Sequence, residues 1–208
     1  MTFDRRGLLI VVEGCDRAGK SSQCELLVKH LTDQGVKTVL MKYPDRESSE
    51  TGRLIDAYLK GSKTINDQAV HLLFSANRWE SMERLDALLK SNTTVVVDRY
   101  TYSGAAYSAA KGLDLEWCKQ PDVGLLKPDC VILLDIDPVV ASQRQEYGAE
   151  RYEQLELQQR VRSNFHLLHK ADSSVTPWHI IDASQSKLKI AHQMQTIATS
   201  FIINKNQQ

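Results

Sequence analysis

A glycine-containing segment at residues 14–21 has the residue types and spacing needed to bind phosphate groups. It reads Gly-Cys-Asp-Arg-Ala-Gly-Lys-Ser, the pattern GxxxxGKS, and lies between an apolar run at residues 8–12 and a helical pattern at residues 23–31. Gly14 and Gly19 allow the backbone to curl so that successive N–H groups point inward, and the following helix adds the positive end of its dipole. The segment predicts a phosphate-binding loop; a plain glycine turn is the alternative.

Side chains at two places could complete a site for a nucleoside triphosphate and a metal ion. Lys20 would reach the outer phosphates, and the Ser21 hydroxyl would join the shell of a phosphate-bound Mg²⁺. A β-branched run at residues 93–97 ends in Asp98 and Arg99. This position is typical of a Walker B aspartate, which lies on the neighbouring strand close to the metal. The alternative, that Asp98 only caps the following helix, stays open.

Two further arginines are candidates for a second anion site, and one of them shares a helix face with an aromatic residue. Arg46 lies in a polar loop at residues 43–51, after the second expected strand, and ligands of open α/β sheets bind at that edge. Phe74 and Arg78 are four residues apart and share one face of a helix. From spacing alone, Phe74 is better interpreted as core, Arg78 as a surface charge and Arg46 as solvated.

The polar segment at residues 144–152 contains two arginines and a glycine. This composition at the active edge of the sheet is typical of a lid that orders when phosphates bind. A solvated helix junction would explain the same pattern.

Strands and helices alternate along the chain, which favours an α/β fold. Apolar or β-branched runs predict five strands, at residues 7–13, 36–41, 93–97, 129–135 and 178–181. Because strand–helix–strand units make right-handed crossovers, the sheet should be parallel. We expect one domain over residues 1–208 with the three-layer P-loop NTPase fold, a five-stranded parallel sheet flanked by helices. Residues 67–90 should form one long helix with Asp67 as its N-cap.

Composition excludes several classes of protein. Lys plus Arg and Asp plus Glu both number 26, so no net charge would draw the chain to nucleic acid or an anionic membrane. Its four cysteines form no CxxC pair, which favours reduced thiols. The apolar run near the N-terminus is too short for a signal peptide or a spanning helix. We expect a soluble protein of the cytoplasm, or also of the nucleus, with neither nucleic-acid nor membrane partners.

A kinase fits these motifs better than a GTP-dependent switch. The sequence has no guanine-reading Asn-Lys-x-Asp, and its one Asp-x-x-Gly, at residues 16–19, lies inside the phosphate loop. A phosphotransferase needs a second anion site facing the first, which Arg46, Arg78 and Arg99 could build.

Several segments closely resemble eukaryotic thymidylate kinases, a family of P-loop nucleoside monophosphate kinases. They are Glu-Gly-Cys-Asp-Arg-Ala-Gly-Lys-Ser-Ser, Tyr-Pro-Asp-Arg, Leu-Leu-Phe-Ser-Ala-Asn-Arg-Trp-Glu, Val-Asp-Arg-Tyr-Thr-Tyr-Ser-Gly, Trp-Cys-Lys-Gln-Pro-Asp-Val-Gly-Leu and Glu-Arg-Tyr-Glu. The resemblance implies transfer of the ATP γ-phosphoryl group to dTMP, giving dTDP in dTTP biosynthesis. It also implies Mg²⁺ as cofactor and a homodimer.

The resemblance implies a role for each matching residue. Phe74 would stack on thymine and Arg78 would hydrogen-bond the base carbonyl. These roles replace the interpretation from spacing, in which Phe74 is a core residue and Arg78 a surface charge. Arg46 and Arg99 would hold the monophosphate, and Tyr152 and Gln158 would close that side. Ser103 and Gly104 would line the base pocket, Tyr107 would lie under the deoxyribose, and Asp16 would accept from the 3′-hydroxyl. Pro44 is a further implied dTMP contact. The implied ATP contacts are Arg17, Ala18, Gly19, Lys20, Ser21 and Ser22, with Arg144 against adenine. Catalysis would rest on Asp16, Arg17, Lys20, Asp98 and Arg99, and metal binding on Ser21 and Asp98.

Two other classes stay open. A deoxynucleoside kinase shares the glycine loop and an Asp-Arg motif, but it phosphorylates a neutral nucleoside and has no use for Arg46 as a second phosphate ligand. A non-catalytic nucleotide-binding protein is disfavoured by the intact Lys20, Ser21 and Asp98.

Overall fold

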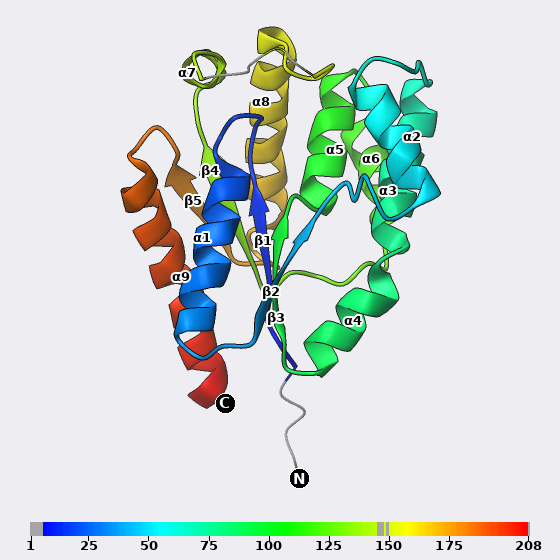
Figure 1. Cartoon of the computed structure of the whole chain (residues 1–208). Coiled ribbons are helices and arrows are strands. Elements are labelled where there is room, and N and C mark those ends of the chain that lie inside the picture. Colours follow the sequence, from blue (N-terminus) through cyan, green and yellow to red (C-terminus); the bar gives the residue numbers. More distant parts are fainter. Residues whose placement is uncertain (1–5, 145–147, 149, 208) are drawn as a thin grey trace.

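The structure, a computed structural model, describes residues 6–144, 148 and 150–207, and its centre is a five-stranded parallel sheet. The strands follow the order β2-β3-β1-β4-β5 (Figure 1). Their bounds are β1 (Leu9–Glu13), β2 (Thr38–Lys42), β3 (Thr94–Asp98), β4 (Cys130–Asp135) and β5 (Trp178–Asp182). The predicted strands and their parallel pairing are confirmed.

Helices cover both faces of the sheet, which confirms the three layers (Figure 1). Helices α1 (Lys20–Asp33) and α9 (Lys187–Gln207) pack on one face, and α5 (Thr101–Ala110) and α8 (Leu155–Asp172) on the other. The remaining elements are α2 (Glu50–Leu59), α3 (Asp67–Trp79), α4 (Met82–Lys90), α6 (Leu115–Lys119), the 3₁₀ turn η1 (Gln120–Asp122) and α7 (Pro138–Ser142). Among the described residues, no helix is long and apolar enough to cross a membrane.

Strand β1 anchors the phosphate loop because it is buried on both faces. Leu9 and Val11 belong to the core beneath α5 and α8, whereas Ile10 and Val12 belong to the core beneath α1 and α9. A continuous apolar strand is what a sheet covered on both sides requires. The loop that follows β1 therefore starts from a rigid support.

The strand register brings the expected site residues to one edge. Val12 pairs with Asp98 of β3, so the phosphate loop and the Walker-B-like aspartate leave the sheet side by side. Met41 of β2 pairs with Val97 of β3, which brings the polar loop after β2 to the same edge. This edge lies at the top of Figure 1, where the loop between β1 and α1 is drawn.

The prediction of one long helix at residues 67–90 is wrong, because the chain divides there into α3 and α4. Ser81 lies at the break. Its hydroxyl donates to the Arg78 carbonyl oxygen (2.9 Å) and contacts the Tyr43 hydroxyl. A serine that bonds the backbone in this way competes with the helical hydrogen bonds.

The N-cap prediction for Asp67 is also wrong by one residue. The Asn66 side chain accepts hydrogen bonds from the backbone N–H groups of Gln68 (3.0 Å) and Ala69 (3.3 Å). Asp67 instead forms an ion pair with Lys111 of the loop after α5 (2.7 Å). Either side chain suits an N-cap, so sequence alone did not separate them.

Candidate active site

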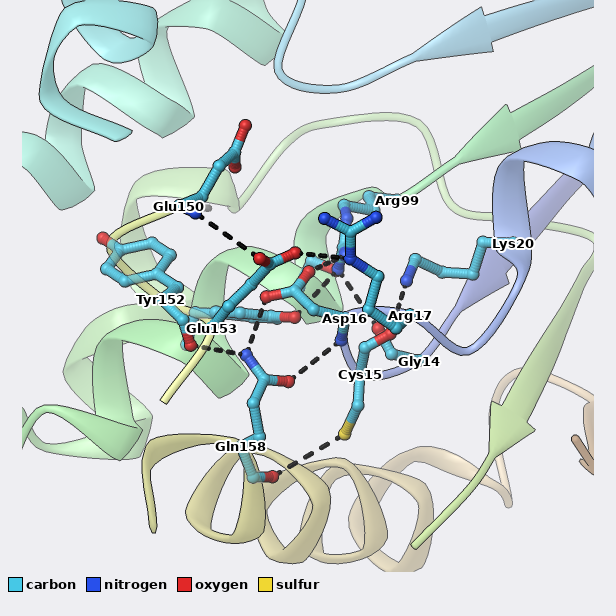
Figure 2. A network of polar contacts seen from close by, with 12 residues as sticks. Gly14, Cys15, Asp16, Arg17, Lys20, Arg99, Glu150, Tyr152, Glu153 and Gln158 are labelled. Carbon is cyan, nitrogen blue, oxygen red and sulfur yellow. Dashed lines mark hydrogen bonds and ion pairs between the residues drawn. The ribbon is translucent and has the colours of Figure 1, made fainter. Parts of the chain in front are cut away.

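The loop between β1 and α1 has the backbone of a phosphate cradle. Gly14 (φ 147°) and Gly19 (φ 91°) adopt conformations that favour glycine. A Cβ atom on Gly14 would lie 2.5 Å from the Leu134 carbonyl oxygen, so a side chain has no room there. Lys20 Nζ donates to the Cys15 carbonyl oxygen (2.6 Å), which turns the lysine back over the loop (Figure 2). The other expected ATP contacts, Ala18 and Ser22, lie in the loop and in the first turn of α1.

The Lys20 ammonium is buried among charged groups. Burial is the main cause that lowers its pKa to about 8; the charge of Arg99 adds to this effect, and Asp16 and Asp98 oppose it. Near neutral pH the lysine therefore still carries its charge, with one carbonyl oxygen as its hydrogen-bond partner among the described residues.

Ser21 and Asp98 are brought together, as the motif predicted. The Ser21 hydroxyl donates to Asp98 Oδ2 (2.6 Å), and Asp98 is 1% exposed. The other carboxylate oxygen, Oδ1, is buried without a hydrogen-bond partner in the described part of the chain. A hydroxyl next to an unsatisfied carboxylate oxygen is the donor set that Mg²⁺ prefers, so these residues fit the implied metal.

The helix after β3 is capped by Glu13 rather than by Asp98, so the capping alternative is wrong. The Glu13 carboxylate accepts hydrogen bonds from the backbone N–H groups of Tyr100 (2.9 Å) and Ser103 (3.1 Å) and from the Ser103 hydroxyl. Burial raises the pKa of Glu13, and these hydrogen bonds oppose the shift. The sequence analysis missed this residue, although an acid that ends an apolar strand was a visible signal.

Asp16 and Arg99 form the centre of a polar network between the phosphate loop and α8 (Figure 2). Arg99 forms an ion pair with Asp16 and donates to the Gly14 carbonyl oxygen (3.1 Å) and the Tyr107 hydroxyl (3.2 Å). The Gln158 amide donates to Asp16 Oδ2 (2.7 Å) and accepts from the Asp16 N–H (2.9 Å). Burial disfavours the Asp16 carboxylate, but Arg99 and Lys20 outweigh this effect and lower its pKa.

A cleft opens beside this network. Apart from Gln158, every residue expected to bind dTMP lines it: Asp16, Pro44, Arg46, Phe74, Arg78, Arg99, Ser103, Gly104, Tyr107 and Tyr152. Five residues to which the sequence analysis assigned no role also line it: Tyr43, Leu59, Tyr100, Ser108 and Glu150.

Arg78 is not the surface charge that its spacing indicated. It is 2% exposed, and its guanidinium forms an ion pair with Asp122 of η1 (2.7 Å). Phe74, one helical turn earlier, is partly buried against the core and faces the cleft. The sequence analysis missed Asp122 because the two residues are far apart in the chain.

Two arginines of the site are paired with carboxylates from the region before α8. Arg46 Nη1 and Nη2 donate to the two carboxylate oxygens of Glu150 (2.6 and 3.1 Å). Arg17 Nε donates to Glu153 (2.7 Å), and both residues are drawn in Figure 2. These acids belong to the Glu-Arg-Tyr-Glu segment that carried the resemblance, but no role was assigned to them.

The predicted lid at residues 144–152 is described only in part, since residues 145–147 and 149 lie outside the described residues. At its start, Arg144 donates to the carbonyl oxygens of Arg17 (2.5 Å) and Ala183 (2.8 Å). At its end, the Tyr152 ring lies 5.6 Å from the Tyr107 ring, measured between centroids. The two ends therefore reach the phosphate loop and the cleft, respectively.

The sheet, the glycine loop and the facing cleft with its arginines define a P-loop phosphotransferase. The sequence matches the thymidylate kinase family over residues 12–194. The chain belongs to this family and is an ATP:dTMP phosphotransferase.

Individual relatives agree with this assignment. The chain is 53% identical to thymidylate kinase of Schizosaccharomyces pombe over 82% of this chain and 80% of the relative. It is 47% identical to the Homo sapiens thymidylate kinase over 88% of this chain and 85% of the relative. The structure of thymidylate kinase from Candida albicans superposes with a TM-score of 0.85 at 36% identity, covering 98% of this chain and 94% of that one.

Proposed function

We propose that the chain phosphorylates dTMP by holding Mg²⁺ and ATP on the phosphate loop and dTMP in the adjoining cleft. The observation that carries this arrangement is Arg99, which donates to Gly14 of the loop (3.1 Å) and to Tyr107 of the cleft (3.2 Å). One cation thus spans both compartments, at the place where the donor and acceptor phosphates would meet.

On the donor side, the loop N–H groups and Lys20 would bind the triphosphate. Ser21 and Asp98 would hold Mg²⁺, which when bound neutralises charge on the phosphate oxygens. Arg144 would lie against adenine, in keeping with its hydrogen bond to Ala183 next to β5. Ala18, Gly19 and Ser22 would complete the contacts.

On the acceptor side, Phe74 would stack on the base and Arg78 would donate to a base carbonyl, with Ser103 and Gly104 forming the wall. Tyr107 would lie under the deoxyribose, and the ionised Asp16 would accept from the 3′-hydroxyl. Arg46 and Arg99 would bind the monophosphate, and Pro44, Tyr152 and Gln158 would enclose it.

The transfer would need alignment and charge stabilisation rather than a covalent intermediate. A phosphate monoester has a second pKa of about 6, so the acceptor is already ionised near neutral pH and requires no general base. Arg17 would offset charge on the transferred group once phosphate displaces it from Glu153.

We further propose a homodimer within the cytoplasm, or also within the nucleus. Leu72 and Trp79 of α3 are 48% and 42% exposed, which supports a protein interface on that helix. Sedimentation velocity would test the dimer, and a monomer at micromolar concentration would contradict it.

The four cysteines are free and buried, in keeping with a reducing compartment.

An ADP-release assay with ATP and Mg²⁺ tests the proposed arrangement, with dTMP, dUMP, UMP and thymidine as acceptors. We expect turnover on the deoxymonophosphates, best with dTMP, and little on UMP, because Tyr107 would exclude a 2′-hydroxyl. Turnover on thymidine without its phosphate would contradict the roles of Arg46 and Arg99. Failure of every acceptor would overturn the proposed function itself.

A further inference from the structure

We propose that Asp122 is a positioning residue which, through Arg78, makes the acceptor site selective for a pyrimidine with a carbonyl group at position 4. The inference rests on the proposed function, since it takes dTMP as the occupant of the cleft. Asp122 does not line the cleft and would not touch the substrate.

The ion pair fixes the Arg78 guanidinium through two of its three nitrogens. Nε and Nη2 donate to Asp122 Oδ1 (3.1 and 2.9 Å), and Nη2 also donates to Oδ2 (2.7 Å). The side chains of Arg78 and Asp122 are 3% and 6% exposed, so water does not compete for these hydrogen bonds. Nη1 has no hydrogen-bond acceptor among the described residues, and Arg78 lines the cleft.

The carboxylate is itself held in place. The Ser75 hydroxyl donates to Asp122 Oδ1 (2.7 Å) and contacts the Pro121 carbonyl oxygen (3.0 Å). Trp79 Nε1 donates to the same carbonyl oxygen (2.8 Å). Helix α3 is therefore hydrogen-bonded to η1 through residues on both sides of Arg78, and these contacts fix the orientation of the Arg78–Asp122 ion pair.

Helix α5 closes the other side of the guanidinium. A Cβ atom on Gly104 would lie 2.7 Å from Arg78 Nη2 and 3.1 Å from Nη1. The glycine lets the α5 backbone pack against the guanidinium, which restricts its movement further. Nη1 is thus the guanidinium nitrogen that remains to donate to a group bound in the cleft, and its position is rigid.

A rigid arginine donor distinguishes a carbonyl group from an amino group. Arginine has no acceptor, and thymine carries a carbonyl oxygen where cytosine carries an amino group. The 2-carbonyl, common to both bases, adjoins the glycosidic bond, and the proposed sugar pocket lies at Asp16 and Tyr107, next to Arg99. Because Asp122 balances the charge of Arg78, this arginine suits a neutral base rather than a phosphate.

The test compares kcat and KM of the wild type and Asp122→Asn with dTMP, dUMP and dCMP. We expect the kcat/KM for dTMP and dUMP to fall together, by about 10- to 100-fold, because both bases carry the 4-carbonyl group. The loss should lie in KM, with kcat within about threefold of wild type, because the phosphate ends are untouched. The preference for dTMP over dCMP should fall at least about tenfold.

Two further variants separate positioning from folding. Asp129→Asn removes a carboxylate that pairs with Arg6 (2.6 Å) at the opposite edge of the sheet, and we expect wild-type preference. Ser75→Ala removes one hydrogen bond to Asp122 and should shift the preference in the same direction by about two- to fivefold.

An unchanged preference in Asp122→Asn, or equal losses on all three acceptors, would overturn the inference. If that variant does not fold, an unchanged preference in Ser75→Ala would overturn it. A wild type inactive on dTMP would instead refute the proposed function.

Discussion

At the scale of single residues, the cations of the site already have oxygen partners within the chain. Lys20 donates to a backbone carbonyl, Arg99 and Asp16 form an ion pair, and Arg46 and Arg17 bind Glu150 and Glu153. Under the proposed function, phosphate oxygens would replace several of these oxygens. We therefore expect substrate binding to exchange one set of partners for another, with an affinity that depends on how tightly each internal partner is held.

Lys20 should make ATP binding depend on pH. Its folded-state pKa of about 8 lies below the usual 10.5, so in the free protein the charge is largely present at pH 7 and is lost as the pH rises through 8. A triphosphate favours the charged form. We therefore expect the Kd for ATP to rise roughly tenfold between pH 7 and about pH 9.

Titration calorimetry in two buffers of different ionisation enthalpy would measure this effect, with uptake of nearly one proton per ATP at the higher pH. The affinity for dTMP, held by arginines that stay charged, is the internal control. A Kd for ATP that stays constant across this range would contradict the prediction. The same pKa shift affects folding. We expect the free energy of unfolding to increase as the pH rises from about 8 to 10.5, because in this range the unfolded chain keeps the Lys20 proton and the folded chain has lost it.

Arg17→Ala should separate catalysis from acceptor binding. Arg17 belongs to the phosphate loop (φ 59°) and does not line the dTMP cleft. Without its charge on the transferred group, we expect kcat to fall by about 10³-fold or more. The Kd for dTMP, measured by fluorescence titration, should stay within about threefold of wild type. Near-normal turnover would show that this arginine has no part in the chemistry.

At the scale of elements, Glu13 joins the two halves of the site. It is the last residue of β1, directly before the phosphate loop, and its carboxylate caps the first turn of α5, which forms a wall of the cleft. The Tyr100 side chain at the N-cap position provides no capping hydrogen bond. The start of α5 therefore depends on a residue distant in sequence.

Glu13→Gln should destabilise the fold. The glutamine amide has one oxygen acceptor where the carboxylate has two, and its NH₂ group would face the N–H and hydroxyl donors of Tyr100 and Ser103. We therefore expect the free energy of unfolding to fall by about 1–3 kcal/mol. Urea unfolding would measure it. Glu25→Gln, an exposed position on α1, is the matched control and should stay within about 0.5 kcal/mol of wild type. Equal stability of the two variants would contradict the capping role.

Glu150→Gln should strengthen dTMP binding. Glu150 and Arg46 are each about one-third exposed (34% and 30%), and in the proposed arrangement the phosphate would compete with this carboxylate for Arg46. An ion pair of this exposure contributes about 0.5–1 kcal/mol, so we expect the Kd for dTMP to fall about two- to fivefold. Thymidine, which lacks the phosphate, serves as the control ligand and should bind both proteins alike. Weaker dTMP binding in the variant would mean that Glu150 supports the substrate instead of competing with it.

At the scale of the whole molecule, one edge of the sheet collects residues that are far apart in the chain. The cleft combines the loops after β1, β2 and β3 with α3, α5 and the segment before α8. The parallel order β2-β3-β1-β4-β5 makes this convergence possible, because the carboxyl ends of all five strands share one edge. The opposite edge carries the Arg6–Asp129 pair and can stabilise the sheet without affecting the chemistry.

The sequence by itself determined the strands, the phosphate loop and two arginines near the cleft, Arg46 and Arg99, because these follow from short-range patterns. An apolar run, two glycines at fixed spacing and a lysine–serine pair specify local conformation and chemistry without reference to the rest of the chain. The resemblance of whole segments to thymidylate kinases supplied the remaining expected cleft residues, such as Phe74 and Arg78, whose spacing alone indicated core and surface.

Only the tertiary structure decided which acids partner these residues and where the helix at residues 67–90 breaks. Asp122 forms an ion pair with Arg78, and Glu150 forms one with Arg46. The partners in each pair are far apart in the sequence, so the periodicity of the sequence does not predict these contacts. Ser81 ends a helical pattern through contacts with Tyr43 as well as with its own backbone. The physical reason is the same in each case: a buried charge or polar group takes the partner that folding brings within hydrogen-bonding distance, and that distance is a property of the packed molecule.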